Sequence, residues 1–146
     1  MKISKLSLDD KEMIKELFVS VFTKEPWNDD WSDETQLDNY IVDLIGNSNS
    51  LTLGYFDEDN LVAVAMGHIK HWYEGTEYYI DELCVKTDRQ GHGIGGSFIS
   101  AIEAYLVGID IRVIFLLTDR DVPAYSFYKS HSFKELEGNV AFAKRI

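Results

Sequence analysis

The feature that most constrains this chain is a glycine-rich run, Gln90–Gly96, placed between a strand-like and a helix-like segment. Four of the ten glycines fall within it. Residues 79–85 before the run have the composition of a strand, and the apolar residues after it recur at helical spacing. Glycines let the backbone approach a ligand, and the first N–H groups of a helix lack internal partners and carry partial positive charge. The pattern therefore predicts a backbone cradle for a phosphate.

Length and charge narrow the class of protein. With 146 residues and no repeat or linker, we expect a single domain over residues 1–146. The net charge of −11 argues against nucleic acid or an anionic membrane as the main partner. It favours a cationic or amine-bearing substrate, unless the acidity serves solubility alone.

Cysteine and apolar patterning bear on compartment and metal binding. The single cysteine, Cys84, rules out an internal disulfide, and no Cys/His cluster predicts a metal site. Because Cys84 lies within an apolar strand, we expect a buried, inert thiol. No run has the length of a membrane span or the core of a signal peptide, so we expect a cytoplasmic protein without a membrane partner.

The order of predicted elements indicates an α/β (α+β) fold, with a mixed, mostly antiparallel central sheet and helices on both faces. The run 111–117 is apolar throughout, as in a strand buried on both faces. In chain order we expect a strand at 3–6, helices over about 10–22 and 32–46, strands at 51–56, 61–69 and 77–85, a helix of about four turns after Gly96, a strand at 111–117, a helix at 123–130 and a strand at 139–144.

The glycine run allows three other interpretations. Gly91, Gly93 and Gly96 satisfy G-x-G-x-x-G, and Asp110 lies near the distance of a ribose-binding acid. However, three antiparallel-looking strands precede the run, and too little chain follows to complete a doubly wound sheet. A nucleoside-triphosphate loop fails because no Gly-Lys-Ser/Thr ends the motif. A ligand-free turn remains an alternative.

The run also resembles a family signature. Gln90-x-x-Gly93-x-Gly95 is similar to the Q/R-x-x-G-x-G/A motif of the GNAT superfamily of N-acetyltransferases. Residues 81–85 stand where that family has its central strand, and the likeness in element order covers nearly the whole chain. A second block is also similar to the family pattern, at Ala124, Phe127, Tyr128 and Phe133. Two positions depart from the pattern: Asp121 replaces the usual Asn, and Ser132 replaces the usual Gly.

The resemblance implies acetyl-CoA as co-substrate and no metal. The backbone at the glycine run would bind the pyrophosphate, with one further hydrogen bond from the Gln90 side chain, and the strand edge would pair with the pantetheine arm. An ionised Asp121 cannot donate a hydrogen bond to pantetheine as an Asn can. The residues implied to bind the cofactor are Leu83, Cys84, Val85, Gln90, Gly91, His92, Gly93, Ile94, Gly95, Gly96, Asp121 and Tyr128.

The reaction that the resemblance implies needs a base and an acid. A lysine-like ammonium of pKa about 10.4 is neutral in only about one molecule in two thousand at pH 7, so a general base is required. Asp81 and Glu82 are the candidates for this base. Because side chains alternate along a strand, we expect only one of them to face the substrate cleft. Asp81 is the preferred candidate. Tyr128 matches the family tyrosine that protonates the departing thiolate. Either carboxylate could instead be an ordinary surface group.

A tryptophan- and aspartate-rich loop is the candidate acceptor site. Trp27, Asp29, Asp30 and Trp31, with Trp72 from a later hairpin, would hold a cationic amine by cation–π and charge contacts. The alternative is core packing for the tryptophans and a capped turn for the aspartates.

We therefore expect an N-acetyltransferase that acts on a primary amine of a small acceptor, polyamine-like or aminoglycoside-like, or of a peptide. A non-catalytic acyl-CoA-binding sensor on the same fold is the alternative. Dimers are common in the family, so a homodimer is one expected assembly.

Overall fold

The computed structural model describes residues Met1 to Ile146. The chain forms five strands and four α-helices, with short 3₁₀ helices before α1 and after β4. The strands are β1 (Lys2–Leu6), β2 (Ser50–Asp57), β3 (Asn60–Trp72), β4 (Gly75–Val85) and β5 (Val113–Leu116), and the helices are α1 (Lys11–Phe22), α2 (Glu34–Ile45), α3 (Ile94–Gly108) and α4 (Pro123–Ser130).

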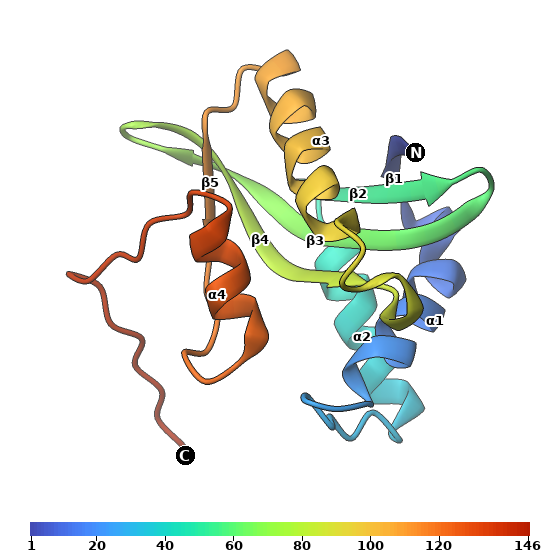
Figure 1. Ribbon diagram of the computed structural model, residues 1–146. Helices are drawn as coiled ribbons and strands as arrows, with labels where there is room; N and C mark the ends of the chain where they lie inside the picture. The colour runs from blue at the N-terminus through green and yellow to red at the C-terminus, as the bar shows by residue number, and fades with distance from the viewer.

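The strands form one sheet in the order β1-β2-β3-β4-β5. All neighbours are antiparallel except β4 and β5, which are parallel and are joined through α3. In Figure 1, α3 lies on one side of the sheet and α1 and α2 lie on the other. The predicted mixed, mostly antiparallel sheet with helices on both faces is therefore confirmed.

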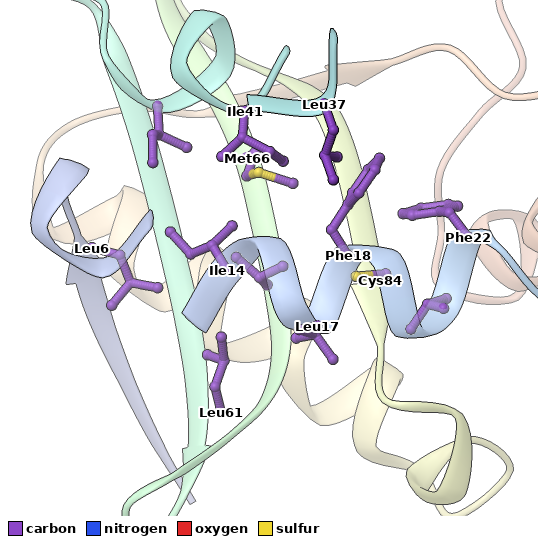
Figure 2. Close-up of a cluster of buried hydrophobic side chains, with 13 residues drawn as sticks. Leu6, Ile14, Leu17, Phe18, Phe22, Leu37, Ile41, Leu61, Met66 and Cys84 are labelled. Carbon is purple, nitrogen blue, oxygen red and sulfur yellow. The ribbon is translucent and has the colours of Figure 1, made fainter. Parts of the chain in front are cut away.

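Each face of the sheet has its own hydrophobic cluster. On one face, the apolar stripe of α1, including Ile14 and Phe18, packs with α2 against residues such as Met66 and Cys84 of the sheet, as Figure 2 shows. On the other face, Phe98 and neighbouring residues of α3 pack against β2, β3 and β4. Burying Cys84 raises the pKa of its thiol, so the expected inert cysteine is confirmed.

The sheet opens between β4 and β5. The two strands pair only where Glu77–Ile80 lie beside Val113–Leu116. Beyond that point, residues 82–85 of β4 still pair with β3 on one edge but have no strand on the other. Figure 1 shows β4 and β5 diverging towards α4. Except for the Val85 carbonyl, which accepts a hydrogen bond from the Gln90 side chain, the backbone groups on this open edge can pair with an extended ligand.

Two predictions for the C-terminal part are wrong. Residues 139–144 form no strand, and Val140 and Phe142 are 73% and 94% exposed, because no sheet edge pairs with this short alternating segment. The run 111–117 is not buried on both faces: Val113 and Leu117 are 49% and 66% exposed. The reason is that β5 is an edge strand, so its outer side lacks a neighbour. No helix combines the length and the apolar character needed to cross a membrane.

Candidate active site

The glycine run folds as a left-handed turn that begins α3. Gly91 and Gly93 have φ of +74° and +78°, a conformation that side-chain-bearing residues rarely adopt. A Cβ atom built at either position would meet nothing within 4 Å. Gly93 is the N-cap of α3, so the turn presents its backbone to open space at the positive end of a helix.

The turn has a row of free donors. The backbone N–H of Gln90 bonds to Thr87 O at 3.3 Å, and that of Ser97 bonds to Gly93 O at 3.0 Å. Between them, the six N–H groups of residues 91–96 donate to no protein acceptor. Six consecutive unpaired donors at a helix start can bind a diphosphate without any basic side chain.

The side chains of the turn bond to its own backbone. The Gln90 Nε2 group donates to the Val85 carbonyl at 2.9 Å, and His92 Nδ1 lies 2.8 Å from the Gln90 carbonyl. Gln90 therefore ties the turn to the end of β4, and the structure does not place its amide as the expected additional phosphate donor.

Gly95 and Gly96 serve helix packing. A Cβ at Gly95 would lie 2.9 Å from Phe127 Cε2, and one at Gly96 would lie 2.5 Å from His131 Nε2. Larger residues at these positions would push α4 away from the start of α3. The four glycines thus divide into two that shape the turn and two that admit α4.

A β-bulge in β4 places the two candidate carboxylates. Met66 of β3 pairs with Glu82 and Gly67 pairs with Ile80, so Asp81 is an extra residue without a partner. A bulge of this kind re-aims side chains and is frequent beside active sites. The expectation that Asp81 and Glu82 point to opposite faces assumed regular alternation, and the bulge makes it wrong.

Both carboxylates lie on the α2 side of the sheet. Tyr40 of α2 donates its hydroxyl to Glu82 Oε1 at 2.6 Å. Asp81 Oδ2 lies 3.0 Å from Nδ1 of His68 on β3, and Asp81 and His68 share a cavity with residues of α2. The two acids therefore lie on the same side of the sheet.

Glu82 is the carboxylate whose proton affinity is altered. Burial raises the pKa of Glu82 above its usual value, and the charges of Asp29 and Asp81 add to the shift, whereas the hydrogen bond from Tyr40 opposes it. A carboxylate with a raised pKa is a stronger base when it is ionised. Burial also raises the pKa of Tyr40, so this tyrosine keeps its proton and remains a donor to Glu82.

Tyr128 lies on α4, the helix that follows the diverging strand β5. Its ring packs edge-on against Phe127 and Phe133 at centroid distances of 5.3 Å and 5.2 Å. Burial raises the pKa of the Tyr128 hydroxyl to about 12, and the charges of Glu82 and Cys84 contribute. The hydroxyl is therefore protonated at neutral pH and within electrostatic range of Glu82, as a proton donor would need to be.

Comparison with known proteins agrees with this arrangement. Residues 11–133 match the model of the acetyltransferase (GNAT) family. The chain belongs to the GNAT acetyltransferase family. It is accordingly an acyltransferase, as the motif resemblance predicted. No curated protein sequence matches the chain.

Solved structures share the fold over nearly the full length. An aminoglycoside acetyltransferase from an uncultured soil metagenomic sample is 25% identical, with a TM-score of 0.73 and coverage of 99% of this chain and 95% of that one; it is also known with bound sisomicin. The aminoglycoside acetyltransferase AAC(6')-Iy, solved with a CoA-based bisubstrate analogue, is 14% identical (TM-score 0.73, coverage 99% and 98%). A ribosomal-protein-alanine N-acetyltransferase from Brucella melitensis biovar Abortus 2308 is 18% identical (TM-score 0.75, coverage 100% of both chains).

In this GNAT enzyme, the loop between α1 and α2 packs against the core and contacts Tyr40, the residue that is hydrogen-bonded to Glu82. Trp31 stacks on Tyr40 with centroids 5.1 Å apart, and Trp27 packs on Phe22 at 5.6 Å. The two tryptophans thus pack against the core, as the alternative interpretation expected, and Trp31 also supports the tyrosine that holds Glu82.

The two aspartates of this loop differ. The Asp29 backbone is tied to Phe22 O at 2.9 Å, and its negative charge raises the pKa of Glu82. Asp30 caps a turn by accepting from the Ser32 N–H at 3.1 Å and is exposed. Asp29 is therefore placed near the carboxylates, whereas the structure ties Asp30 only to a local turn.

Two predicted site residues lie elsewhere or lack partners. Trp72 is 46% exposed at the tip of the β3–β4 hairpin with Lys70 Nζ over its ring at 4.7 Å, and Figure 1 places this tip far from the α1–α2 loop. Trp72 is therefore not part of the same wall. Asp121 is exposed before α4 and makes no hydrogen bond. No three or more His, Cys, Asp or Glu side chains are grouped so as to hold a metal ion.

Sequence reasoning missed Tyr40 and His68. Tyr40 occupies an inward position of a helix, where an aromatic residue predicts only packing. His68 stands within an apolar strand pattern and carries no motif. Each of them lies on a different element from the carboxylate that it contacts, and residue spacing within one segment cannot predict a contact between two elements.

Proposed function

We propose that this protein transfers the acetyl group of acetyl-CoA to a primary amine, and that its acceptor is a small polycation of the polyamine or aminoglycoside type. The observation that carries the proposal is the continuity between the free N–H groups of residues 91–96, the open edge of β4 and the carboxylates at the bulge. A ligand with a diphosphate and an extended amide-bearing arm fits this path.

The residues present fit the co-substrate. The N–H groups of residues 91–96 would bind the pyrophosphate, and the open edge of Leu83–Val85 would pair with the amide-bearing arm. Acetyl-CoA supplies the acetyl group as a thioester, which would lie near Glu82 when the arm is paired. The CoA-based complex of AAC(6')-Iy supports this assignment.

Two kinds of side chain serve proton transfer. The carboxylates Asp81 and Glu82 provide the base that an ammonium acceptor needs, directly or through a neighbouring group. Tyr128 keeps its proton at neutral pH and would return a proton to the departing thiolate. Asp121 cannot donate to the arm while it is ionised, so its position is expected to contribute nothing to cofactor binding.

Acidic surroundings support a cationic acceptor. Asp29, Asp81 and Glu82 add negative charge on the α2 side of the bulge, and the chain carries a net charge of −11. Such a field attracts and orients a polycation. The aminoglycoside acetyltransferases with this fold support the same class, and the ribosomal-protein enzyme makes a peptide amine the second candidate.

A binding and release experiment tests the proposal. Coenzyme A is titrated by calorimetry, and free thiol is then followed with acetyl-CoA and sisomicin, spermidine or a peptide with a free N-terminus. Thiol release with sisomicin or spermidine supports the proposal, release with the peptide alone replaces the acceptor class, and binding without release favours the sensor alternative.

A matched pair of variants checks the cradle. Gly93→Val forces a side chain into a left-handed turn at the free donors, whereas Gly138→Val alters an exposed glycine with nothing nearby. We expect the dissociation constant for coenzyme A to rise at least about tenfold for the first and to stay unchanged for the second. Equal affinities would remove the cradle from the proposal.

A further inference from the structure

A histidine that no motif marked is bonded to one of the candidate acids. His68 is on β3, and its Nδ1 atom lies 3.0 Å from Asp81 Oδ2. The contact exists because the bulge turns Asp81 out of the regular strand alternation. The ring of His68 is also stacked on Tyr79, with centroids 5.0 Å apart and planes 18° apart, so its orientation is held on two sides.

This contact selects the tautomer of the histidine. An ionised aspartate can only accept hydrogen bonds, so Nδ1 of His68 must carry the proton that it donates to Asp81. In the neutral ring the other nitrogen, Nε2, then has a free lone pair. A base oriented by a carboxylate through its second nitrogen is the arrangement that general-base histidines use.

The pair lies in a cavity on the α2 side. A space of about 260 Å³ beside the bulge is open to solvent and is bounded by residues from α2, the segment after it, β2, β3 and β4. Its lining consists of Asp43, Leu44, Asn47, Asn49, Ser50, His68 and Asp81. The acidic and amide groups of this lining suit an ammonium group.

We infer that His68 Nε2 is the group that takes the proton from the acceptor's ammonium, and that Asp81 is a positioning residue that acts through His68. The inference rests on the proposed acetyl transfer and names the base within that site. A neutral imidazole whose Nδ1–H is held by a carboxylate offers the lone pair of Nε2 as a proton acceptor. The Asp81 Oδ2 atom is already engaged by His68.

The proton balance is complete. An N–H bond of the ammonium breaks, the proton goes to Nε2, and the electron pair stays on the amine nitrogen. The nitrogen then forms its bond to the acetyl carbonyl carbon as the carbon–sulfur bond breaks. Tyr128 protonates the departing thiolate to give the free thiol, and the second proton lost by the nitrogen restores the Tyr128 hydroxyl. The proton on His68 returns to water.

Charged and titratable groups around His68 set its response to pH. Asp81 and Tyr79 face it from β4, and Asp43 faces the same cavity from α2. Loss of the base should appear as a change in the pH profile of the reaction and leave coenzyme A binding unaffected.

His68→Asn is the central test, because an Asn amide can keep a hydrogen bond to Asp81 but cannot take a proton. With the amine that the acceptor panel identifies, we expect kcat/KM at pH 7 to fall roughly 10²-fold. At about pH 9.5, where a larger share of the acceptor is already neutral, the loss should shrink to within about fivefold. The dissociation constant for coenzyme A should stay unchanged, and imidazole should restore part of the rate of His68→Ala.

His71→Asn is the matched control. His71 lies on the same strand, is exposed, and has its Nδ1 3.1 Å from Thr76 Oγ1, outside the cavity. Its profile should match that of the wild type. An unchanged profile for His68→Asn in a protein whose wild type is active would overturn the inference and leave the proposed function standing. A full loss confined to Glu82→Gln would do the same and would make Glu82 the base.

If the wild type releases no thiol with any amine of the panel, the proposed function itself fails and the inference fails with it. His68→Gln is the second variant, in case the Asn form folds poorly; a thermal melt like that of the wild type qualifies either variant for the test.

Discussion

Residues 1–111 and residues 112–146 are held in place by different forces. Every fully buried residue of the protein belongs to the first region and the last of them is Ile111, although Ile114 and Leu116 of β5 pack, partly buried, against the second cluster. None of the residues from Arg112 onwards is buried; β5 and α4 are at most half-buried. The first region positions the glycine turn and the carboxylates, whereas the second carries Tyr128.

The second region is held by strand pairing between β4 and β5, by partly buried apolar and aromatic contacts, and by polar contacts. Glu135 accepts a hydrogen bond from the Tyr125 hydroxyl at 2.8 Å and forms an ion pair with Arg120. The pKa of Glu135 is lowered, first by the hydrogen bond from Tyr125. The ring of Phe127 packs over Gly95 at the start of α3. The candidate bases therefore lie on strands that are anchored in the core, whereas Tyr128, the candidate acid, lies on a partly exposed helix. The position of that helix depends in addition on the ligand that would fill the open edge of β4.

The largest difference between the two regions is expected in the loss of unfolding free energy when a large side chain is removed. Phe18 is 1% exposed in the first cluster, so Phe18→Ala should lower the free energy of unfolding by about 3–5 kcal/mol. Phe142 is 94% exposed, and Phe142→Ala should change it by less than about 0.5 kcal/mol. Urea denaturation measures both. Similar losses for the two variants would mean that the C-terminal segment contributes to the core.

Binding of coenzyme A should reduce the difference in local stability between the two regions. At a concentration of about one hundred times its dissociation constant, it should raise the free energy of unfolding by about 2.7 kcal/mol. Because the ligand would fill the open edge between β4 and β5, amide hydrogen exchange should slow more in β5 and α4 than in α1. Uniform slowing across all helices would contradict a ligand seated at this edge.

The pH dependence of stability should reveal the buried acid. Because burial raises the pKa of Glu82, the stability contributed by its protonated form is fully present below the ordinary value of 4.5 and is lost as the pH rises through the folded value. Glu82→Gln should therefore match the wild type at acidic pH and exceed it in stability at neutral pH. Denaturation from acidic to neutral pH tests this, with the exposed Glu103→Gln on α3 as control. A constant difference at all pH values would show that the carboxylate is not buried in its charged form.

The smallest effect is expected at a turn in the second region. Ser132 has φ of +68°, where a side chain is strained and glycine is not. Ser132→Gly should raise the free energy of unfolding by up to about 1 kcal/mol, whereas Ser130→Gly at the end of α4 should lower it by a similar amount. Thermal melts distinguish the two signs. Destabilisation by Ser132→Gly would show that the serine side chain holds the turn.

Local patterns predicted much of the fold. The apolar stripes of α1 and α2 were sufficient to predict these helices because their inward residues repeat at helical spacing. The apolar run of β3 was likewise sufficient to predict a strand. The glycine turn was predictable because few other local structures need so many glycines before a helix. The strand predicted at 139–144 does not form, because an alternating segment becomes a strand only if the edge of a neighbouring strand pairs with it.

The sequence by itself determined the element order from β1 to α4, the glycine turn and the family, since each depends on residues close together in the chain. Only the tertiary structure decided where the side chains of the site meet. The bulge at Asp81 follows from the register between β3 and β4, and it brings both carboxylates to one side. Tyr40 and His68 reach those acids from α2 and β3. Contacts between distant segments depend on strand register and helix docking, which are set by packing of the whole core and leave no local periodicity in the sequence.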